Sequence, residues 1–329
     1  MKLLRRIPLH VSLLLLVAWS ALPFVWTFQT SIKFTRDVAS REPVLWGYDT
    51  TANGYEAFWF EGEVNMWSVL WFLVGLAGLC ALTYQLGKRL HLGVIGNAVV
   101  ALLLTLAVWS VPKIWETSDQ YRFFVNSLIV TVLTVVTSIG IGVFAGYGLA
   151  RYRGVSGAVI LIVALGFRSL PRFAFVLPFF FLGKSLGILD SRLVIVMALV
   201  AINQPFTIWM LRSFFMDVPR ELEEAAVMDG ATRFQAFRQV ILPTMKPGII
   251  ATSLFTMMLA YNEFLIVRVL APTNWTMPVG MVALVAGESS KTITEAAAAG
   301  ISVTIPIIIV IIFFQKHLVK GLGAGAVKG

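Results

Sequence analysis

Ionisable and amide side chains interrupt the long apolar segments of this 329-residue sequence. Polar groups at depth in a membrane are costly, and they usually face the interior of a helical bundle or a wet pathway. Asn203 and Gln204, in the middle of one segment, and Glu263, in another, are therefore our candidates for lining a substrate pathway. These side chains could bind a polar solute, and Glu263 could also relay ions. They do not suggest covalent catalysis.

Two arginines, Arg168 and Arg172, lie four residues apart in a third apolar segment, so they would share one face of a helix. Pro171 interrupts the hydrogen-bond ladder between them. They could line a pathway or brace neighbouring helices through backbone carbonyls, and we favour bracing. Arg268 lies five positions after Glu263, so these two need not pair.

Other reactive side chains are too few or too scattered for a catalytic or metal site. One cysteine, Cys80, excludes an intrachain disulfide framework and a multi-cysteine metal site, and the three histidines are far apart. Gly183-Lys184-Ser185 superficially resembles a phosphate-binding loop, but Pro178 occupies the position of the required upstream glycine. We therefore expect no nucleotide, metal or other cofactor to be bound by this chain.

The composition is that of a membrane protein. Hydrophobic residues make up 58% of the sequence and charged residues only 13%, about half the usual share of a soluble domain. The mean hydropathy is +0.84. These values exclude a soluble enzyme and a disordered chain. The net charge of +9 is best explained by membrane topology, so we expect lipid and not nucleic acid to surround the protein.

Eight segments have the roughly 20 apolar residues that a helix needs to cross a membrane. They cover residues 8–28, 66–86, 93–112, 123–150, 157–182, 192–214, 248–270 and 298–315. Trp19, Phe24 and Trp26 stand where small residues would mark a signal-peptide cleavage site, so we expect the first segment to be a retained anchor. Gly142 and Gly146 in the fourth segment have the spacing of close helix packing.

The connecting segments predict the orientation. If the N-terminus is cytoplasmic, basic residues outnumber acidic residues on the cytoplasmic side, whereas acidic residues are in excess outside, mainly in the segment 30–65. This distribution follows the positive-inside rule and predicts that both termini are cytoplasmic. The segment 30–65 would form a small folded external cap.

One cytoplasmic connection, residues 216–247, is long and patterned. A helix is expected over 221–228, because Glu221, Glu223 and Glu224 lie in its first turn, where the helix dipole favours negative charge. Gly230 is a natural stop, since glycine adopts the left-handed conformation after a helix.

A second helix would follow, with Thr232 as its N-cap. Phe234, Phe237 and Ile241 fall on one face of it, and Pro243 and Pro247 would end it. The connection is thus expected to form a helix–turn–helix elbow, which from periodicity alone could simply lie at the membrane surface.

Glu224-Ala225-Ala226, Gly230 and Val240-Ile241-Leu242-Pro243 together resemble the EAA loop of binding-protein-dependent ABC importer permeases. That pattern has Glu-Ala-Ala, three residues, Gly, nine residues, then Ile-x-Leu-Pro, and Val240 replaces the Ile. The resemblance extends from Asn126 to the C-terminus. Its tail is similar to that of maltose-type permeases, and the pair of segments at 66–112 departs from the usual six spans.

The resemblance implies a transport subunit without catalysis of its own. Its partners would be two cytoplasmic ATP-binding subunits that bind ATP and Mg²⁺, a second and different permease subunit, and an external solute-binding protein. The imported solute would be a carbohydrate or related polyol. The residues implied in coupling to the ATPase are Glu221, Glu224, Ala225, Ala226, Asp229, Gly230, Leu242 and Pro243.

We therefore predict an all-α, polytopic membrane protein of the type I ABC importer class in a bacterial inner membrane. Residues 1–118 would form an N-terminal membrane region, and residues 119–329 the permease domain. The tail 316–329 resembles one that reaches between ATPase subunits, and an unstructured end is the alternative. The competing functions are an ion-coupled secondary carrier, which would leave the elbow unexplained, and a membrane scaffold without a substrate path.

Overall fold

The computed structural model describes residues 7–38, 40, 42, 44–62, 64–89, 93–152, 154–286 and 293–326. These residues are predominantly helical, and the β-pairing among them is limited to two isolated bridges, Lys33 with Thr50 and Phe60 with Thr117. The predicted all-α class is confirmed, as expected where lipid cannot satisfy backbone groups. The chain divides into unit 1, residues 1–125 with 280–304, and unit 2, residues 126–279 with 305–329.

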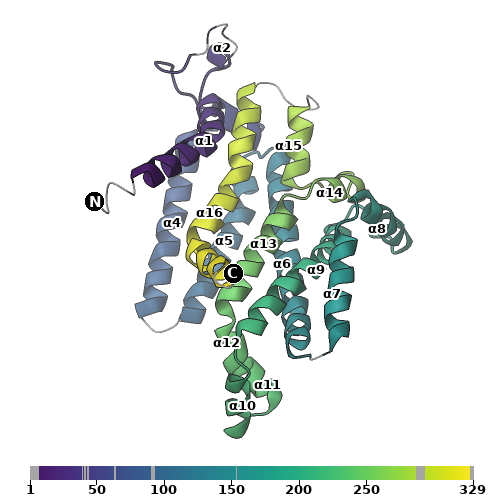
Figure 1. Ribbon diagram of the computed structural model, residues 1–329. Helices are drawn as coiled ribbons and strands as arrows, with labels where there is room; N and C mark the ends of the chain where they lie inside the picture. Colours follow the sequence, from purple (N-terminus) through teal and green to yellow (C-terminus); the bar gives the residue numbers. More distant parts are fainter. Residues whose placement is uncertain are drawn as a thin grey trace. The chain divides into compact units, whose positions relative to one another are not determined.

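Unit 1 contains the N-terminal helices (Figure 1). They are α1 (Ile7–Ser31), α2 (Thr35–Val38), α3 (Asn53–Trp59), α4 (Met66–Arg89) and α5 (Gly93–Ile114). Helices α4 and α5 lie side by side as an antiparallel hairpin. The segment between α1 and α4 is folded: the Ser31 and Tyr55 hydroxyls lie 2.8 Å apart, and the Lys33 ammonium donates to the Val44 carbonyl at 2.6 Å.

Most helices of unit 2 are shorter and irregular, apart from α6 (Asp119–Arg151) and α9 (Arg192–Asp217). The others are α7 (Val155–Arg168), α8 (Phe173–Ser185), α10 (Glu221–Met228), α11 (Arg233–Ala236), η2 (Phe237–Ile241), α12 (Leu242–Thr244), α13 (Lys246–Tyr261) and α14 (Leu265–Leu270). Helices α15 (Met277–Val285) and α16 (Ile293–Ala326) run from one unit into the other.

Among the described residues, six helices are long and apolar enough to cross a membrane. If each of two bent helix pairs also forms one span, the number of candidate spans rises to eight. The apolar segment predicted at 157–182 forms two helices and not one, because α7 and α8 meet at 92°. Pro171 explains the break, since proline has no N–H and keeps the preceding residue out of the helical region. Arg168 and Arg172 consequently do not share a helix face.

The predicted span at 248–270 is also interrupted. Helix α13 ends at Tyr261 and α14 begins at Leu265, and the 70° bent pair is instead Arg233–Thr244 with Lys246–Tyr261. The sequence predicts that Pro243 ends the second elbow helix. In the structure Pro243 lies inside α12 instead. Just before it the helix widens into the π-helical turn η2, where the Leu242 N–H donates to the Phe237 carbonyl.

The C-terminal helix α16 continues through most of the tail 316–329, to Ala326, so the alternative of an unstructured end does not hold over 316–326. Residues 327–329 lie outside the described residues. The core of unit 2 has two clusters. One surrounds the N-terminal half of α9 with α14, and the other surrounds the C-terminal end of α9 with η2. The second cluster supports the elbow.

Candidate functional site

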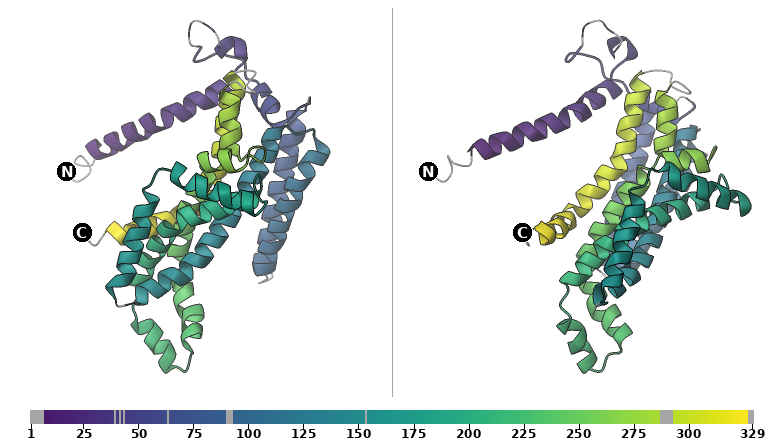
Figure 2. Two further views of the ribbon diagram at one scale, coloured as in Figure 1. Left: turned by 90° about the vertical axis from the view of Figure 1, so that its right-hand side faces the viewer. Right: turned by 45° about the vertical axis from the view of Figure 1, so that its right-hand side comes forward.

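The elbow formed by α10 and α11 projects from one end of unit 2 (Figure 2). The first helix has the bounds predicted from the sequence, Glu221–Met228, with its three glutamates in the first turn. Glu221, Glu224 and Ala225 are exposed, and Ala226 is half-buried. The small side chains leave the outer face of α10 open to close approach by another surface.

Gly230 terminates α10 as predicted. Its φ of +91° lies in the left-handed region, which side chains other than glycine adopt only with strain. The Gly230 N–H donates to the Val227 carbonyl and the Ala231 N–H to the Ala226 carbonyl, both at 3.0 Å. These two bonds form a Schellman motif, so the last carbonyls of α10 are satisfied by the turn itself.

The second elbow helix begins at once with a capping box. The Thr232 Oγ1 accepts from the Gln235 N–H at 3.3 Å, and the Gln235 Oε1 accepts from the Thr232 N–H at 2.8 Å. Only residues 229–232 separate α10 from α11, and the caps on both sides fix their conformation. The elbow is therefore a rigid turn and not a loose tether.

Apolar side chains of the elbow remain in contact with solvent. Met228 is 86% exposed and Phe234 62%, and Leu222 and Val227 are exposed as well. Beside them lies a hollow of about 570 Å³. It is lined by Arg151, Arg220, Glu223, Glu224, Val227, Met228 and Arg233. A surface that combines exposed apolar side chains with a charged hollow is typical of a protein-binding site.

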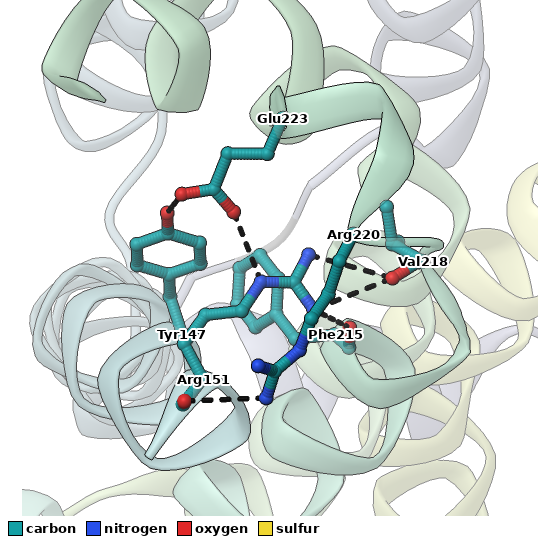
Figure 3. Close-up of polar contacts among 6 residues, drawn as sticks. All are labelled: Tyr147, Arg151, Phe215, Val218, Arg220 and Glu223. Atoms are coloured by element: carbon teal, nitrogen blue, oxygen red, sulfur yellow. Dashed lines mark hydrogen bonds and ion pairs between the residues drawn. The ribbon is translucent and has the colours of Figure 1, made fainter. Parts of the chain in front are cut away.

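Glu223 lines this hollow together with Arg151, and its carboxylate joins α10 to the end of α6 (Figure 3). The Arg151 Nε donates to its Oε2 at 3.0 Å, and the Tyr147 hydroxyl donates to its Oε1. The Arg151 and Glu223 side chains are only 16% and 19% exposed. We refer to Tyr147, Arg151 and Glu223 as the clamp.

The clamp also holds the end of α9. The Arg151 guanidinium donates to the carbonyls of Phe215 and Val218, both at 3.3 Å. In return, the Arg220 guanidinium donates to the Arg151 carbonyl at 3.2 Å. Together with the clamp, these bonds connect the ends of α6 and α9 to α10.

The sequence did not point to the clamp. Glu223 was expected only to interact favourably with the helix dipole, and no pairing was predicted for Arg151. Tyr147 is an ordinary aromatic residue in an apolar helix. Because Arg151 and Glu223 are 72 positions apart, no local spacing connects them. Opposite charge at two helix ends that we expect on the same side of the membrane was the one available signal.

The polar residues predicted within the membrane fall into separate pairs. Arg172 lies 3.6 Å from a Glu263 carboxylate oxygen, and Arg168 lies over the ring of Phe206, 4.5 Å from its centroid. Arg268 similarly lies 4.6 Å from the ring centroid of Trp275. Arg168 and Arg172 thus contact an aromatic ring and a carboxylate, whereas the bracing expected from the sequence was through backbone carbonyls.

Asn203 and Gln204 lie in the unbroken helix α9. Asn203 is 1% exposed, and the Gln204 Nε2 donates to the Ser138 carbonyl at 3.1 Å. The Asn203 Oδ1 and Gln204 Oε1 are buried without a hydrogen-bond partner among the described residues. Within this chain Gln204 therefore belongs to the contact between α9 and α6, and Asn203 is buried.

Comparison with known proteins places this geometry in a family. The family model described as "Binding-protein-dependent transport system inner membrane component" matches residues 138–323, which include the elbow and the clamp. The trehalose transport system permease protein SugB of Mycobacterium tuberculosis is 33% identical over 208 residues, 62% of this chain and 76% of SugB. The diacetylchitobiose uptake system permease protein DasC of Streptomyces coelicolor is 34% identical over 65% of this chain and 78% of DasC.

Among solved structures, a chain of a bacterial ABC transporter involved in the import of the acidic polysaccharide alginate has a TM-score of 0.63. It shares 22% sequence identity and covers 95% of this chain and 96% of its own, so it supports the fold. The resemblance inferred from the EAA pattern is confirmed. The family model covers more than half of the chain, and this multi-pass membrane protein belongs to the family of binding-protein-dependent transport system inner membrane components.

Proposed function

We propose that this chain forms half of the translocation pathway of an ATP-driven importer and that its elbow couples transport to ATP hydrolysis. Its partners are two cytoplasmic ATP-binding subunits that hold ATP and Mg²⁺, a different second permease subunit and an external solute-binding protein. Both termini lie in the cytoplasm. The single observation that carries the proposal is the rigid elbow, with its capped turn and its exposed apolar face.

The exposed side chains define what the ATPase must present. Met228 and Phe234 require an apolar groove, since their exposure in a stable cytoplasmic protein would be unfavourable. Arg233 at the edge of the hollow favours a carboxylate on the partner. Ala225 and Ala226 allow the groove wall to approach the backbone of α10. A groove of this kind would hold α10 as a helix docked by one face.

Rigidity is what makes the docked helix useful. ATP can favour one access state only if its binding energy acts differently on the two states, so the joint must transmit displacement. Gly230 and the Thr232 cap keep α10 and α11 in a fixed relation. Movement of α10 therefore reaches the membrane helices instead of being absorbed in the turn.

The solute is a carbohydrate or related polyol. The relatives named above as trehalose and diacetylchitobiose permeases support this class. An ion-coupled carrier is not favoured, because Glu263, its candidate relay group, is paired with Arg172.

The proposal is tested with Gly230→Asp. The complex is purified with its ATPase and solute-binding protein, reconstituted in liposomes and assayed for ATP-dependent uptake of trehalose and diacetylchitobiose. We expect the variant to insert normally but to lose uptake, because the side chain strains the turn that positions α10. Normal uptake at normal protein level would contradict the proposal, as would wild-type transport without ATP or partners.

Gly187→Asp is the matched control. Gly187 also has a positive φ, +66°, and as at Gly230 no atom of the described residues would lie within 4 Å of an added Cβ. The backbone strain is therefore similar, but Gly187 lies in the α8–α9 connection, away from the elbow. Uptake should be retained in this control and lost only at Gly230.

A further inference from the structure

Helix α10 has two covalent routes into the membrane. Residues 218–220 connect it to α9, and the second elbow helix connects it to α13. Helix α6 is remote in sequence, with 69 residues between the end of α6 at Arg151 and the start of α10 at Glu221. If displacement of α10 followed the chain alone, α6 would respond only through its packing against α9.

The clamp gives α6 a direct attachment instead. Both carboxylate oxygens of Glu223 are bound by side chains of α6, one by Arg151 and the other by Tyr147. A carboxylate held by two donors from one helix is fixed in orientation as well as in position. The Tyr147 ring adds an apolar contact, because its centroid lies 4.7 Å from that of Phe237 in η2. Helix α6 is thus attached to both arms of the elbow.

Helices α6 and α9 pack closely against each other next to the clamp. A Cβ added at Gly146 would lie 3.0 Å from the Arg212 backbone nitrogen, and one added at Gly142 would lie 2.9 Å from a Leu211 methyl group. The two helices therefore touch over two successive turns directly above Arg151. A displacement of Arg151 would therefore act on α6 close to its contact with α9.

We infer that Tyr147, Arg151 and Glu223 are positioning residues that transmit the displacement of α10 directly to α6. The inference rests on the proposed function, since it assumes that an ATPase moves α10. It adds that Glu223, one residue before the Glu-Ala-Ala triplet, faces the membrane helices and not the ATPase. Docking and transmission are thereby assigned to different side chains, with Met228 and Phe234 available for docking and Glu223 engaged with α6.

The test follows the movement of α6 itself. In a Cys80→Ser background, spin labels are placed on Gly148→Cys in α6 and on Lys246→Cys at the start of α13, both exposed positions. The distance between the labels is measured in the complete complex with and without Mg-ATP and vanadate. We expect an ATP-dependent shift that is lost in Arg151→Gln and in Glu223→Gln.

The charge reversal Arg151→Glu with Glu223→Arg should restore at least part of that shift, whereas each reversal alone should not. Such rescue would show that the two side chains act as a pair, and the ATP-dependent shift, measured with the ATPase subunits still bound, separates transmission from a merely structural role. Arg238→Gln is the control for loss of an exposed arginine on the elbow and should keep the shift. Should Arg151→Gln fail to assemble, Tyr147→Phe removes one hydroxyl donor, keeps the ring, and is expected to reduce the shift.

The outcomes separate this inference from the proposed function. An unchanged shift in the clamp variants, with the ATPase subunits still bound, overturns the inference and leaves the proposed function intact. If the wild-type protein shows no ATP-dependent shift and retains no ATPase subunit, the proposed function itself fails. Loss of the shift with retained ATPase and rescue by the double reversal supports the clamp.

Discussion

Arg172 and Glu263 join two interrupted helices of the membrane region. Arg172 follows the 92° break between α7 and α8, and Glu263 lies between α13 and α14. Their charged atoms are 3.6 Å apart, and the Glu263 Oε1 also accepts from the Ile266 N–H at 3.4 Å. The side chain of Glu263 is 8% exposed and that of Arg172 37%. The ion pair therefore connects the α7–α8 break with the interruption between α13 and α14 and helps to stabilise both.

Removing one partner of this pair should cost more than removing both. In Arg172→Met the buried Glu263 carboxylate loses its counter-charge, and we expect a loss of about 2–3 kcal/mol, reduced from the buried-pair range because Arg172 is partly exposed. The double variant Arg172→Met with Glu263→Gln should recover part of this loss, since no unpaired charge remains. Thermal unfolding in detergent compares the stabilities of Arg172→Met, Glu263→Gln and the double variant with that of the wild-type protein. Additive losses would show that the two side chains are not coupled.

The glycines of α6 should respond in opposite directions to alanine. Gly146→Ala should destabilise by about 1–3 kcal/mol, because the Arg212 backbone nitrogen would lie only 3.0 Å from the new Cβ. At Gly148 no described atom is within 4 Å of an added Cβ, so Gly148→Ala should be neutral or stabilise by about 0.5–1 kcal/mol through helix propensity. The same thermal assay compares them. Equal effects would contradict close packing between α6 and α9.

The capping box should control the stability of the second elbow helix. Thr232→Val preserves the shape of the side chain but removes the oxygen that accepts from the Gln235 N–H, at a local cost of about 0.5–2 kcal/mol. Hydrogen exchange over 233–236 should become faster. Thr232→Ser keeps the acceptor and serves as the control. Unchanged exchange in Thr232→Val would mean that tertiary contacts alone hold α11.

Alkaline pH should loosen the segment between α1 and α4. Burial raises the pKa of Tyr55 above its usual 10.0, an effect only partly offset by the hydrogen bond with Ser31. A raised folded-state pKa means that the stabilisation is complete below pH 10 and is lost as the pH rises through the folded pKa. The protection of 53–59 against hydrogen exchange, taken relative to the intrinsic rate at each pH, should therefore fall above about pH 10 in the wild-type protein. Tyr55→Phe should remove this dependence, and its persistence would refute the role of Tyr55.

Local features were predictable because neighbouring residues determine them. The bounds of α10 follow from the glutamates at its start and Gly230 after its end, and the Thr232 cap needs only Gln235 three residues later. The apolar segments likewise predict membrane helices, because lipid requires about 20 apolar residues per span. The EAA spacing lies within one such local stretch, which is why the sequence alone identified the family.

Contacts between distant segments required the tertiary structure. Tyr147 and Arg151 meet Glu223 only because α6 and α9 pack closely at Gly142 and Gly146, and nothing in local spacing encodes that distance. The pairing of Arg172 with Glu263 depends on two helix breaks, one of which changed the expected face of Arg172. Periodicity reports which side of a helix is apolar, but the partner that a polar side chain meets is decided by how the helices pack.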